Sequence, residues 1–100
     1  MELISQYQNQ IRILCRKHRV SELFVFGSVL GDSFNEESDI DFVVDFSDVS
    51  LEDYADNYFD LKFSLERIFE RDVDLIERKA IRNPYLLESI DSTKQLVYEA

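Results

Sequence analysis

The chain of 100 residues contains few of the residue types on which disulfide-bonded, zinc-binding or membrane-spanning proteins depend. Its single cysteine, Cys15, excludes an intramolecular disulfide and a cluster of thiol ligands. Its single histidine, His18, excludes zinc sites built from several histidines. No apolar run approaches the roughly 20 residues that span a bilayer, and no apolar signal segment follows Met1. The sequence therefore predicts a soluble protein of the reducing cytoplasm, with no membrane partner.

Lysine and arginine are absent between Val20 and Leu61. The whole chain has 11 basic and 21 acidic residues, which gives a net charge of −10. That basic-free stretch carries twelve acids: Glu22, Asp32, Glu36, Glu37, Asp39, Asp41, Asp45, Asp48, Glu52, Asp53, Asp56 and Asp60. A general nucleic-acid binder needs a basic surface, so direct nucleic-acid binding is not expected. The stretch is either a solvated acidic face or the location of a bound cation.

The residues that are present predict one small α+β domain over residues 1–100, with helices packed on a mixed β-sheet. A hydrophobic content of 45% is enough for a modest core. Periodicity and capping residues predict these elements: a helix over 3–18, a strand over 23–26, a loop over 27–38 with room for one helical turn, a strand over 40–46, a helix over 51–69 capped by Ser50, a strand over 73–77, a helix over 85–91 after Asn83 and Pro84, and an edge strand or a helix over 96–98.

Acidic side chains are placed inside apolar strand patterns at two points of the chain. Asp39 and Asp41 stand two residues apart at the start of the second predicted strand, so they project to the same face. Asp74 lies within the apolar run of the third predicted strand. Aspartate is unfavourable in strands, and paired carboxylates are suitable ligands for magnesium. If the two strands are neighbours, the three carboxylates can form a two-metal site.

The first predicted strand ends in Phe26-Gly27-Ser28. Glycine allows the backbone to approach a ligand closely, and the amides that follow it can bind phosphate oxygens. The Ser28 hydroxyl adds one more donor. A phosphate-binding turn beside a carboxylate metal site is the equipment for phosphoryl or nucleotidyl transfer.

The spacing of these residues resembles that of the nucleotidyltransferase superfamily related to DNA polymerase beta. Gly27-Ser28 is followed by ten residues, then by Asp39-x-Asp41, and a third aspartate, Asp74, lies on a later strand. In length the chain is similar to the minimal nucleotidyltransferases, which are often paired with helical HEPN-domain proteins in toxin–antitoxin modules. The resemblance implies the nucleotidyltransferase fold. It also implies that Gly27 and Ser28 contact the β- and γ-phosphates of ATP or another nucleoside triphosphate, that Asp39 and Asp41 bind magnesium, and that Asp74 is a further ligand or the general base. Many relatives carry arginines just after Gly-Ser, whereas this chain continues Val29-Leu30-Gly31-Asp32.

Two functions follow from the resemblance. In the first, the chain is a magnesium-dependent enzyme that moves AMP from ATP to a hydroxyl, a tyrosine for example, of a HEPN-type toxin. In the second, it is a binding module that neutralises or assembles with a helical partner by contact and retains the three acids as a relic. The missing loop arginines favour the second hypothesis, and the complete set of acids favours the first.

The remaining candidates have plainer interpretations. Cys15 and His18 lie on the apolar face of the first helix and are expected to pack there. Asp45, at the far end of the second strand, is expected to be solvated. Phe59 and Phe63 widen the apolar sector of the helix over 51–69, so they are either covered by the domain itself or part of an oligomer or partner interface.

Overall fold

The computed structural model describes residues 2–31 and 34–100, with the backbone alone at residues 28 and 29. Its elements in chain order are α1 (Glu2–Gln6), α2 (Gln8–Lys17), β1 (Val20–Phe26), the 3₁₀ turn η1 (Gly27–Leu30), β2 (Ile40–Phe46), α3 (Leu51–Phe69), β3 (Val73–Glu77), the 3₁₀ turn η2 (Arg78–Ala80), α4 (Pro84–Thr93) and β4 (Gln95–Glu99). The strands form one sheet in the order β3-β2-β1-β4. β1 is antiparallel to both β2 and β4, whereas β2 and β3 are parallel, so the sheet is mixed.

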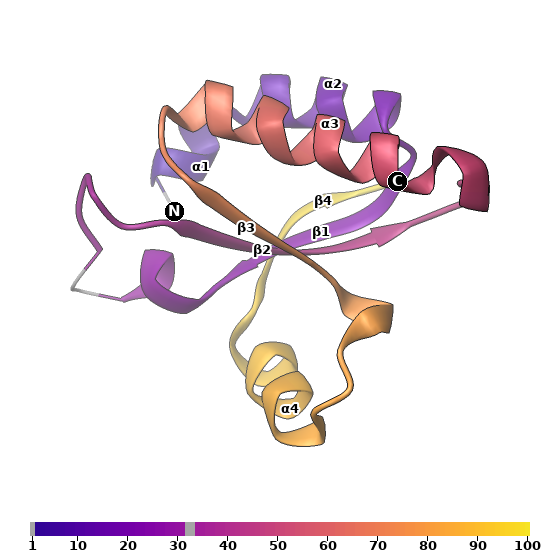
Figure 1. Ribbon diagram of the computed structural model, residues 1–100. Coiled ribbons are helices and arrows are strands. Elements are labelled where there is room, and N and C mark those ends of the chain that lie inside the picture. The colour runs from indigo at the N-terminus through magenta and orange to yellow at the C-terminus, as the bar shows by residue number, and fades with distance from the viewer. Residues whose placement is uncertain (1, 32–33) are drawn as a thin grey trace.

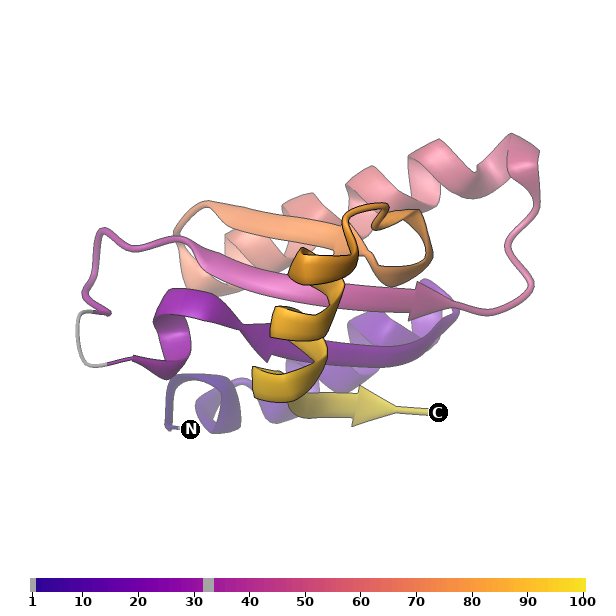
Figure 2. The same cartoon turned by 90° about the horizontal axis from the view of Figure 1, so that it is seen from below.

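The helices cover the two faces of this sheet unequally. α1, α2 and α3 lie across one face, and α4 lies on the other (Figure 1). Seen from the side of α4, this helix crosses the strand direction (Figure 2). The arrangement confirms the predicted α+β class with a mixed sheet.

The main core lies between the sheet and the three helices α1, α2 and α3. Alternate residues of the central strands point into it, for example Leu23 and Val25 of β1 and Phe42 and Val44 of β2, all of them buried. Cys15 is completely buried there, and its burial raises the pKa of the thiol to about 12. The expectation that Cys15 packs in the core is therefore confirmed.

Some element boundaries differ from the sequence prediction. The first predicted helix is divided at Tyr7, whose φ of −112° and ψ of 19° are not helical. The Tyr7 ring instead packs edge-on against Phe69, with 5.3 Å between the ring centroids. β1 starts at Val20 rather than at Leu23, because its polar first residues pair with β2 and β4. The last segment is the edge strand β4, so of the two alternatives for residues 96–98 the strand is confirmed.

Side chains of α3 occupy hydrogen-bonding groups along the outer edge of β3. The backbone N–H of Val73 donates to the Glu66 carboxylate at 3.0 Å. The Tyr58 hydroxyl donates to the carbonyl oxygen of Leu75. An edge strand with free backbone groups invites pairing with another chain, and these two bonds remove part of that opportunity. α3 therefore protects the sheet as well as covering it.

α3 begins and ends with defined caps. Ser50 Oγ accepts a hydrogen bond from the backbone N–H of Asp53 at 3.3 Å, as the sequence predicts for an N-cap, and donates one to the Asp53 carboxylate at 3.0 Å. At the other end Glu70 adopts the left-handed conformation, with φ of 54° and ψ of 42°. Glycine is the usual residue at such a position. Within residues 2–31 and 34–100, no helix is long and apolar enough to span a membrane.

We predict that Glu70→Gly raises the free energy of unfolding by about 1 kcal/mol, because a side chain in the left-handed region costs roughly 1–2 kcal/mol and the added backbone freedom of glycine offsets part of the gain. Urea unfolding followed by circular dichroism measures the change. Glu70→Ala is the matched control, since it removes the same charge but keeps a Cβ. Equal stability of the Gly and Ala variants would show that the left-handed turn carries no strain.

Candidate active site

The turn that ends β1 lies against the Asp41 carboxylate. Gly27 has a φ of +75°, in the left-handed region that favours glycine. A Cβ built at Gly27 would overlap Asp41 Oδ2 and lie 3.3 Å from Asp41 Cγ. The two residues meet because Phe26 of β1 pairs with Asp41 of β2 in the antiparallel register. Glycine is therefore required at position 27 for two reasons: its backbone conformation and the space that the carboxylate occupies.

Asp41 and Asp74 lie side by side in the sheet. They are direct partners in the parallel register of β2 and β3. Their sequence neighbours Phe42 and Leu75 point into the main core, so the two carboxylates project from the opposite face, on which α4 lies. Asp41 is half-buried and Asp74 is exposed. The expectation that the second and third predicted strands are neighbours is confirmed, and the structure brings these two acids together.

Asp39 immediately precedes β2 and is exposed. The peptide after it is held in the sheet, because the Ile40 N–H donates to the Asp72 carbonyl at 3.2 Å. Across residues 2–31 and 34–100, no group of three or more His, Cys, Asp or Glu side chains is arranged to hold a metal ion. The complete three-carboxylate site therefore stays a prediction. Its oxygen donors fit magnesium, a hard cation, and the missing Cβ of Gly27 leaves the Asp41 carboxylate its space.

Ser28 belongs to the turn η1, but its side chain lies outside the described residues. Its predicted contact with phosphate accordingly stays a prediction. η1 begins at Gly27, the residue that lies against the Asp41 carboxylate. The backbone amides of η1 therefore follow this contact directly in the sequence.

Two residues near the acids were not identified from the sequence. The pKa of Tyr58 is raised, mainly by burial and further by the negative charge of Asp74, so α3 comes close to the exposed acid of β3. Arg71 donates hydrogen bonds to the loop that leads to Asp39. Tyr58 fits the apolar periodicity of α3, and Arg71 stands between two acids in a polar turn. Neither pattern indicates that Tyr58 lies near Asp74 or that Arg71 bonds to the loop before Asp39.

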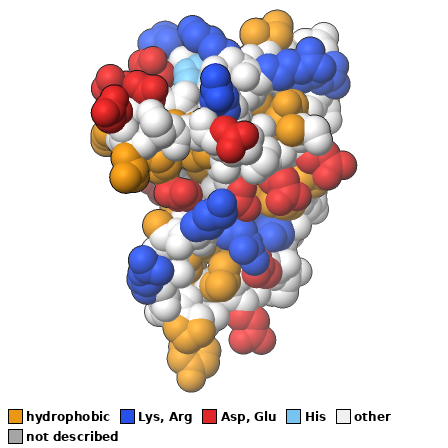
Figure 3. Space-filling view, turned by 90° about the vertical axis from the view of Figure 1, so that its right-hand side faces the viewer, with side chains coloured by type: hydrophobic (Ala, Val, Ile, Leu, Met, Phe, Trp, Pro, Cys, Tyr) orange, Lys and Arg blue, Asp and Glu red, His pale blue; other side chains and the backbone are white. Residues whose placement is uncertain are grey.

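The far end of the same sheet face holds a second group of charges. Asp45 is half-buried rather than solvated, and its Oδ1 is buried without a hydrogen-bond partner among the residues described. Glu22 is its register partner on β1. The Arg78 guanidinium pairs with Asp91 at 2.9 Å, and the pKa of Arg78 is raised chiefly by that partner and also by Asp45 and Glu22. The expected solvation of Asp45 is wrong because η2 and α4 cover this end of the sheet. Figure 3 shows acidic and basic side chains in adjoining bands on one side of the molecule.

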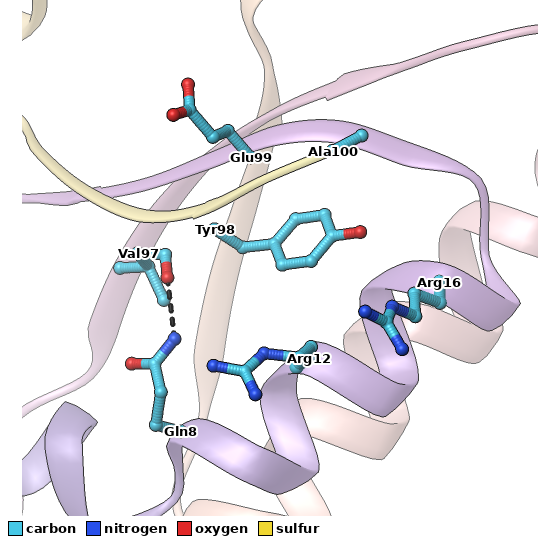
Figure 4. Close-up of a pocket in the computed structure, with 7 residues that line it drawn as sticks. All are labelled: Gln8, Arg12, Arg16, Val97, Tyr98, Glu99 and Ala100. Atoms are coloured by element: carbon cyan, nitrogen blue, oxygen red, sulfur yellow. Dashed lines mark hydrogen bonds between the residues drawn. The ribbon is translucent and has the colours of Figure 1, made fainter.

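A separate hollow of about 380 Å³ lies between α2 and β4. Arg12 and Arg16 extend into it from successive turns of α2, and the Tyr98 ring lies between strand and helix (Figure 4). Gln8 donates a hydrogen bond to the carbonyl of Val97 at 2.8 Å (Figure 4). The hollow lies on the side of the sheet that α1, α2 and α3 cover, whereas Asp41 and Asp74 project from the face on which α4 lies, so this hollow is separate from the candidate site.

Known proteins resemble the chain along its whole length. A Methanocaldococcus jannaschii protein with the provisional name protein adenylyltransferase MJ1379 is 35% identical over 102 residues, covering 98% of this chain and 99% of that protein. The structure of a provisionally named minimal nucleotidyltransferase superposes with a TM-score of 0.73 at 28% identity, covering 94% of this chain and 92% of that chain. A chain of the complex between tri-AMPylated Shewanella oneidensis HEPN toxin and MNT antitoxin superposes with a TM-score of 0.66 at 18% identity, covering 97% and 73%, and this likeness concerns the fold alone.

We predict that Gly27→Ala destabilises the fold by at least about 1–2 kcal/mol, the cost of a left-handed non-glycine residue, and displaces the Asp41 carboxylate.

We also predict that millimolar magnesium raises the melting temperature of the wild type, and that Gly27→Ala and Asp41→Asn reduce this rise. Thermal unfolding with and without magnesium measures both effects. Gly31→Ala is the control, since it makes the same substitution at the other glycine of the chain. A wild-type melting temperature that does not change with magnesium would refute the metal prediction. Equal melting temperatures of the Gly27→Ala and Gly31→Ala variants would refute the close approach of Gly27 and Asp41.

The sequence pattern of the nucleotidyltransferase domain family matches residues 8–97. The matched stretch contains the turn at Gly27, both acids of Asp39-x-Asp41, and Asp74. The strand order that brings Asp41 beside Asp74 is found in a fold shared with a minimal nucleotidyltransferase over nearly the whole chain. The chain therefore belongs to the nucleotidyltransferase domain family, and it is a nucleotidyltransferase.

Proposed function

We propose that the chain transfers AMP from ATP to a hydroxyl of a partner protein in a magnesium-dependent reaction, as the antitoxin of a HEPN-type toxin. One observation carries the proposal: the Asp41 carboxylate lies against the Cα of Gly27 while Asp74 is its direct neighbour on β3. The turn expected to bind phosphate and the acids expected to bind metal are thereby combined in one place. This combination matches the needs of nucleotidyl transfer.

The chain's own residues have distinct roles in this proposal. The backbone amides after Gly27 and the Ser28 hydroxyl hold the β- and γ-phosphates. Asp39 and Asp41 hold magnesium, and Asp74 is a further ligand or the base that accepts the proton of the acceptor hydroxyl. When bound, magnesium neutralises the triphosphate charge and makes the attacking oxygen a better nucleophile. In the transfer, the acceptor oxygen forms a bond to the α-phosphorus, and the bond from that phosphorus to the pyrophosphate oxygen breaks.

The choice of a protein acceptor is supported by the relatives. MJ1379 is named a protein adenylyltransferase, and in the Shewanella oneidensis complex the HEPN toxin is AMPylated. ATP and a HEPN-type helical protein are therefore the expected partners of this chain. The alternative, a binding module without transfer, is favoured by one observation: two aromatic rings on α3 are half-exposed, which would serve contact alone.

We predict that the purified chain, incubated with the protein encoded beside it, ATP and magnesium, adds the mass of AMP to that partner. Asp41→Asn and Asp39→Asn should abolish labelling, and Ser28→Ala should slow it about 10²–10³-fold, the usual effect of losing one donor to a developing charge. Asp72→Asn is the matched control, because it removes an equal charge two residues before Asp74. Intact-mass spectrometry measures the product.

Labelling that survives Asp39→Asn would assign the activity to another protein. Partner binding without any labelling of the wild-type mixture would favour the binding-module alternative. Labelling lost equally in Asp72→Asn would indicate that net charge, and not the position of the carboxylates, decides the rate.

Phe59 and Phe63 form an aromatic patch on the outer face of α3. They are 49% and 48% exposed, and their rings stack with 5.9 Å between centroids. Phe59 also packs edge-on against Tyr58 at 5.1 Å. α4 lies on the other face of the sheet and does not cover them (Figure 1). Beside the patch is a hollow of about 390 Å³, lined by Tyr54, Ala55, Tyr58, Phe59, Glu77 and Ala80.

The patch is proposed as the docking surface for the helical partner, with self-association as the competing use. Burying a phenylalanine is worth about 1.5–3 kcal/mol, and aromatic residues are frequent anchors of interfaces. Helical periodicity predicts that Leu51 joins the apolar face of α3, and this prediction is wrong, since Leu51 is 96% exposed at the first position of the helix.

We predict that the double substitution of Phe59 and Phe63 by Ser weakens partner binding at least about tenfold, which corresponds to 1.4 kcal/mol, while the fold is retained. Calorimetry measures the affinity, and light scattering of the chain alone measures self-association. Leu51→Ser is the control, since it removes an exposed apolar side chain from the other end of α3. A double variant that binds and assembles like the wild type would exclude the patch from both interfaces.

A further inference from the structure

The segment between the turn at Gly27 and the acids of β2 ends in a compact turn over residues 35–38. The Ser38 N–H donates to the Asn35 carbonyl at 3.1 Å, and the Asn35 N–H donates to Ser38 Oγ at the same distance. The Glu37 N–H donates to Asn35 Oδ1 at 2.8 Å. These bonds give the turn its shape, but all of them are internal. They do not fix its position against the sheet.

Arg71 joins the turn to the segment between α3 and β3. Its Nη1 donates to the carbonyl oxygens of Asn35 and Ser38, at 2.9 and 3.0 Å, so one guanidinium joins the first and last residues of the turn. The same guanidinium lies over the Phe34 ring, with 4.8 Å from Cζ to the ring centroid. Arg71 Nε is buried and has no hydrogen-bond partner among the described residues. Burying the unpaired Nε is costly, and the contacts that Nη1 and the guanidinium plane make with the loop offset that cost.

The contact with Ser38 matters because its carbonyl belongs to the peptide bond that precedes Asp39. The peptide bond that follows Asp39 is held by the next residue of the same segment, since the Ile40 N–H donates to the Asp72 carbonyl at 3.2 Å. Residues 71 and 72 thus hold the backbone on both sides of Asp39. We propose that Arg71 is a positioning residue, which sets the place of the Asp39 carboxylate relative to Asp41.

Arginine suits this role and lysine does not. The planar guanidinium can bond to two acceptors and stack on a ring at the same time, whereas an ammonium group on a flexible stem cannot reproduce that geometry. The cation also has to come from outside the loop, because no lysine or arginine occurs between Val20 and Leu61. Arg71 supplies this cation from the turn just before β3, the strand that pairs with β2.

The inference relies on the proposed function only in assigning Asp39 as a metal ligand, so the test includes a readout that needs no metal. Hydrogen–deuterium exchange over residues 34–40 and Mn²⁺ binding by electron paramagnetic resonance are measured for the wild type, Arg71→Lys and Arg71→Ala. Arg67→Lys is the matched control, since Arg67 is exposed and bonds only locally to Ser64 Oγ at 3.1 Å. Exchange over α3 and β1 reports whether each variant is folded.

In both Arg71 variants, exchange over residues 34–40 is expected to rise about tenfold or more, while α3 and β1 keep their protection. Mn²⁺ affinity is expected to fall about 10–100-fold, the usual effect of losing a residue that orients a ligand. Millimolar methylguanidinium should restore part of the affinity in Arg71→Ala, and it should not affect Arg71→Lys.

Unchanged exchange over residues 34–40 in both Arg71 variants would overturn the inference. Increased exchange with wild-type Mn²⁺ affinity would also overturn it, because Arg71 would then order the loop without placing Asp39. A wild type that binds no Mn²⁺ would count against the proposed function, and the exchange comparison would still decide whether Arg71 holds the segment before Asp39.

Discussion

The contact between the Asp41 carboxylate and the Cα of Gly27 is the constraint on which the site depends. It requires a residue without a side chain, in a backbone conformation that other residues adopt only with strain. It also requires the register of β1 and β2, since a shift by one residue would turn Asp41 into the core and Phe42 out of it. The conformation of the turn, the position of the Asp41 carboxylate and the register of β1 and β2 therefore depend on one another. Any substitution that alters one of them is expected to alter the other two.

The second constraint is electrostatic. The chain has a net charge of −10 and places Asp41, Asp45 and Asp74 on the sheet face away from α1–α3, where a few cations come from elsewhere in the sequence. Arg71 bonds to the loop before β2, and Arg78 pairs with Asp91 near Asp45 at the opposite end of that strand. Asp91 is shared, since Lys94 bonds to its other oxygen at 2.8 Å. One cation therefore lies near each end of β2, Arg71 from the turn before β3 and Arg78 from η2 after it.

Much of this arrangement could be predicted from the sequence, because its strongest patterns are local. The apolar runs of β2 and β3 and the Ser50 cap of α3 define their elements to the residue. The pairing of Asp41 with Asp74 follows once these strands are neighbours, and the glycine turn follows from Phe26-Gly27-Ser28. The break at Tyr7 could not be predicted, because an aromatic residue at a helical interval looks like a core position in either case. Its cause is a ring contact with Phe69, at the far end of α3.

The roles of Arg71 and Asp45 were missed for a related reason. An arginine between two acids is typical of a solvated turn. The bonds from Arg71 to residues 35 and 38 arise from the tertiary structure alone. Asp45 occupies a strand end that periodicity leaves open to water, and only the placement of η2 and α4 closes it. Long-range polar contacts of this kind have no periodic pattern in the sequence.

The hydrogen bonds from Tyr58 and Glu66 to the outer edge of β3 have a consequence for recognition. A strand that approached this edge would find the Val73 N–H and the Leu75 carbonyl already bonded, so extension of the sheet by a partner strand is less favourable there. Recognition at this edge would then depend on side chains, and those beside β3 include the aromatic rings of α3 and the carboxylate of Glu77. Such a surface discriminates by composition and shape, so it can diverge between related pairs of proteins without any change in the backbone of the sheet. The same bonds make uncontrolled edge-to-edge pairing of sheets through β3 less favourable.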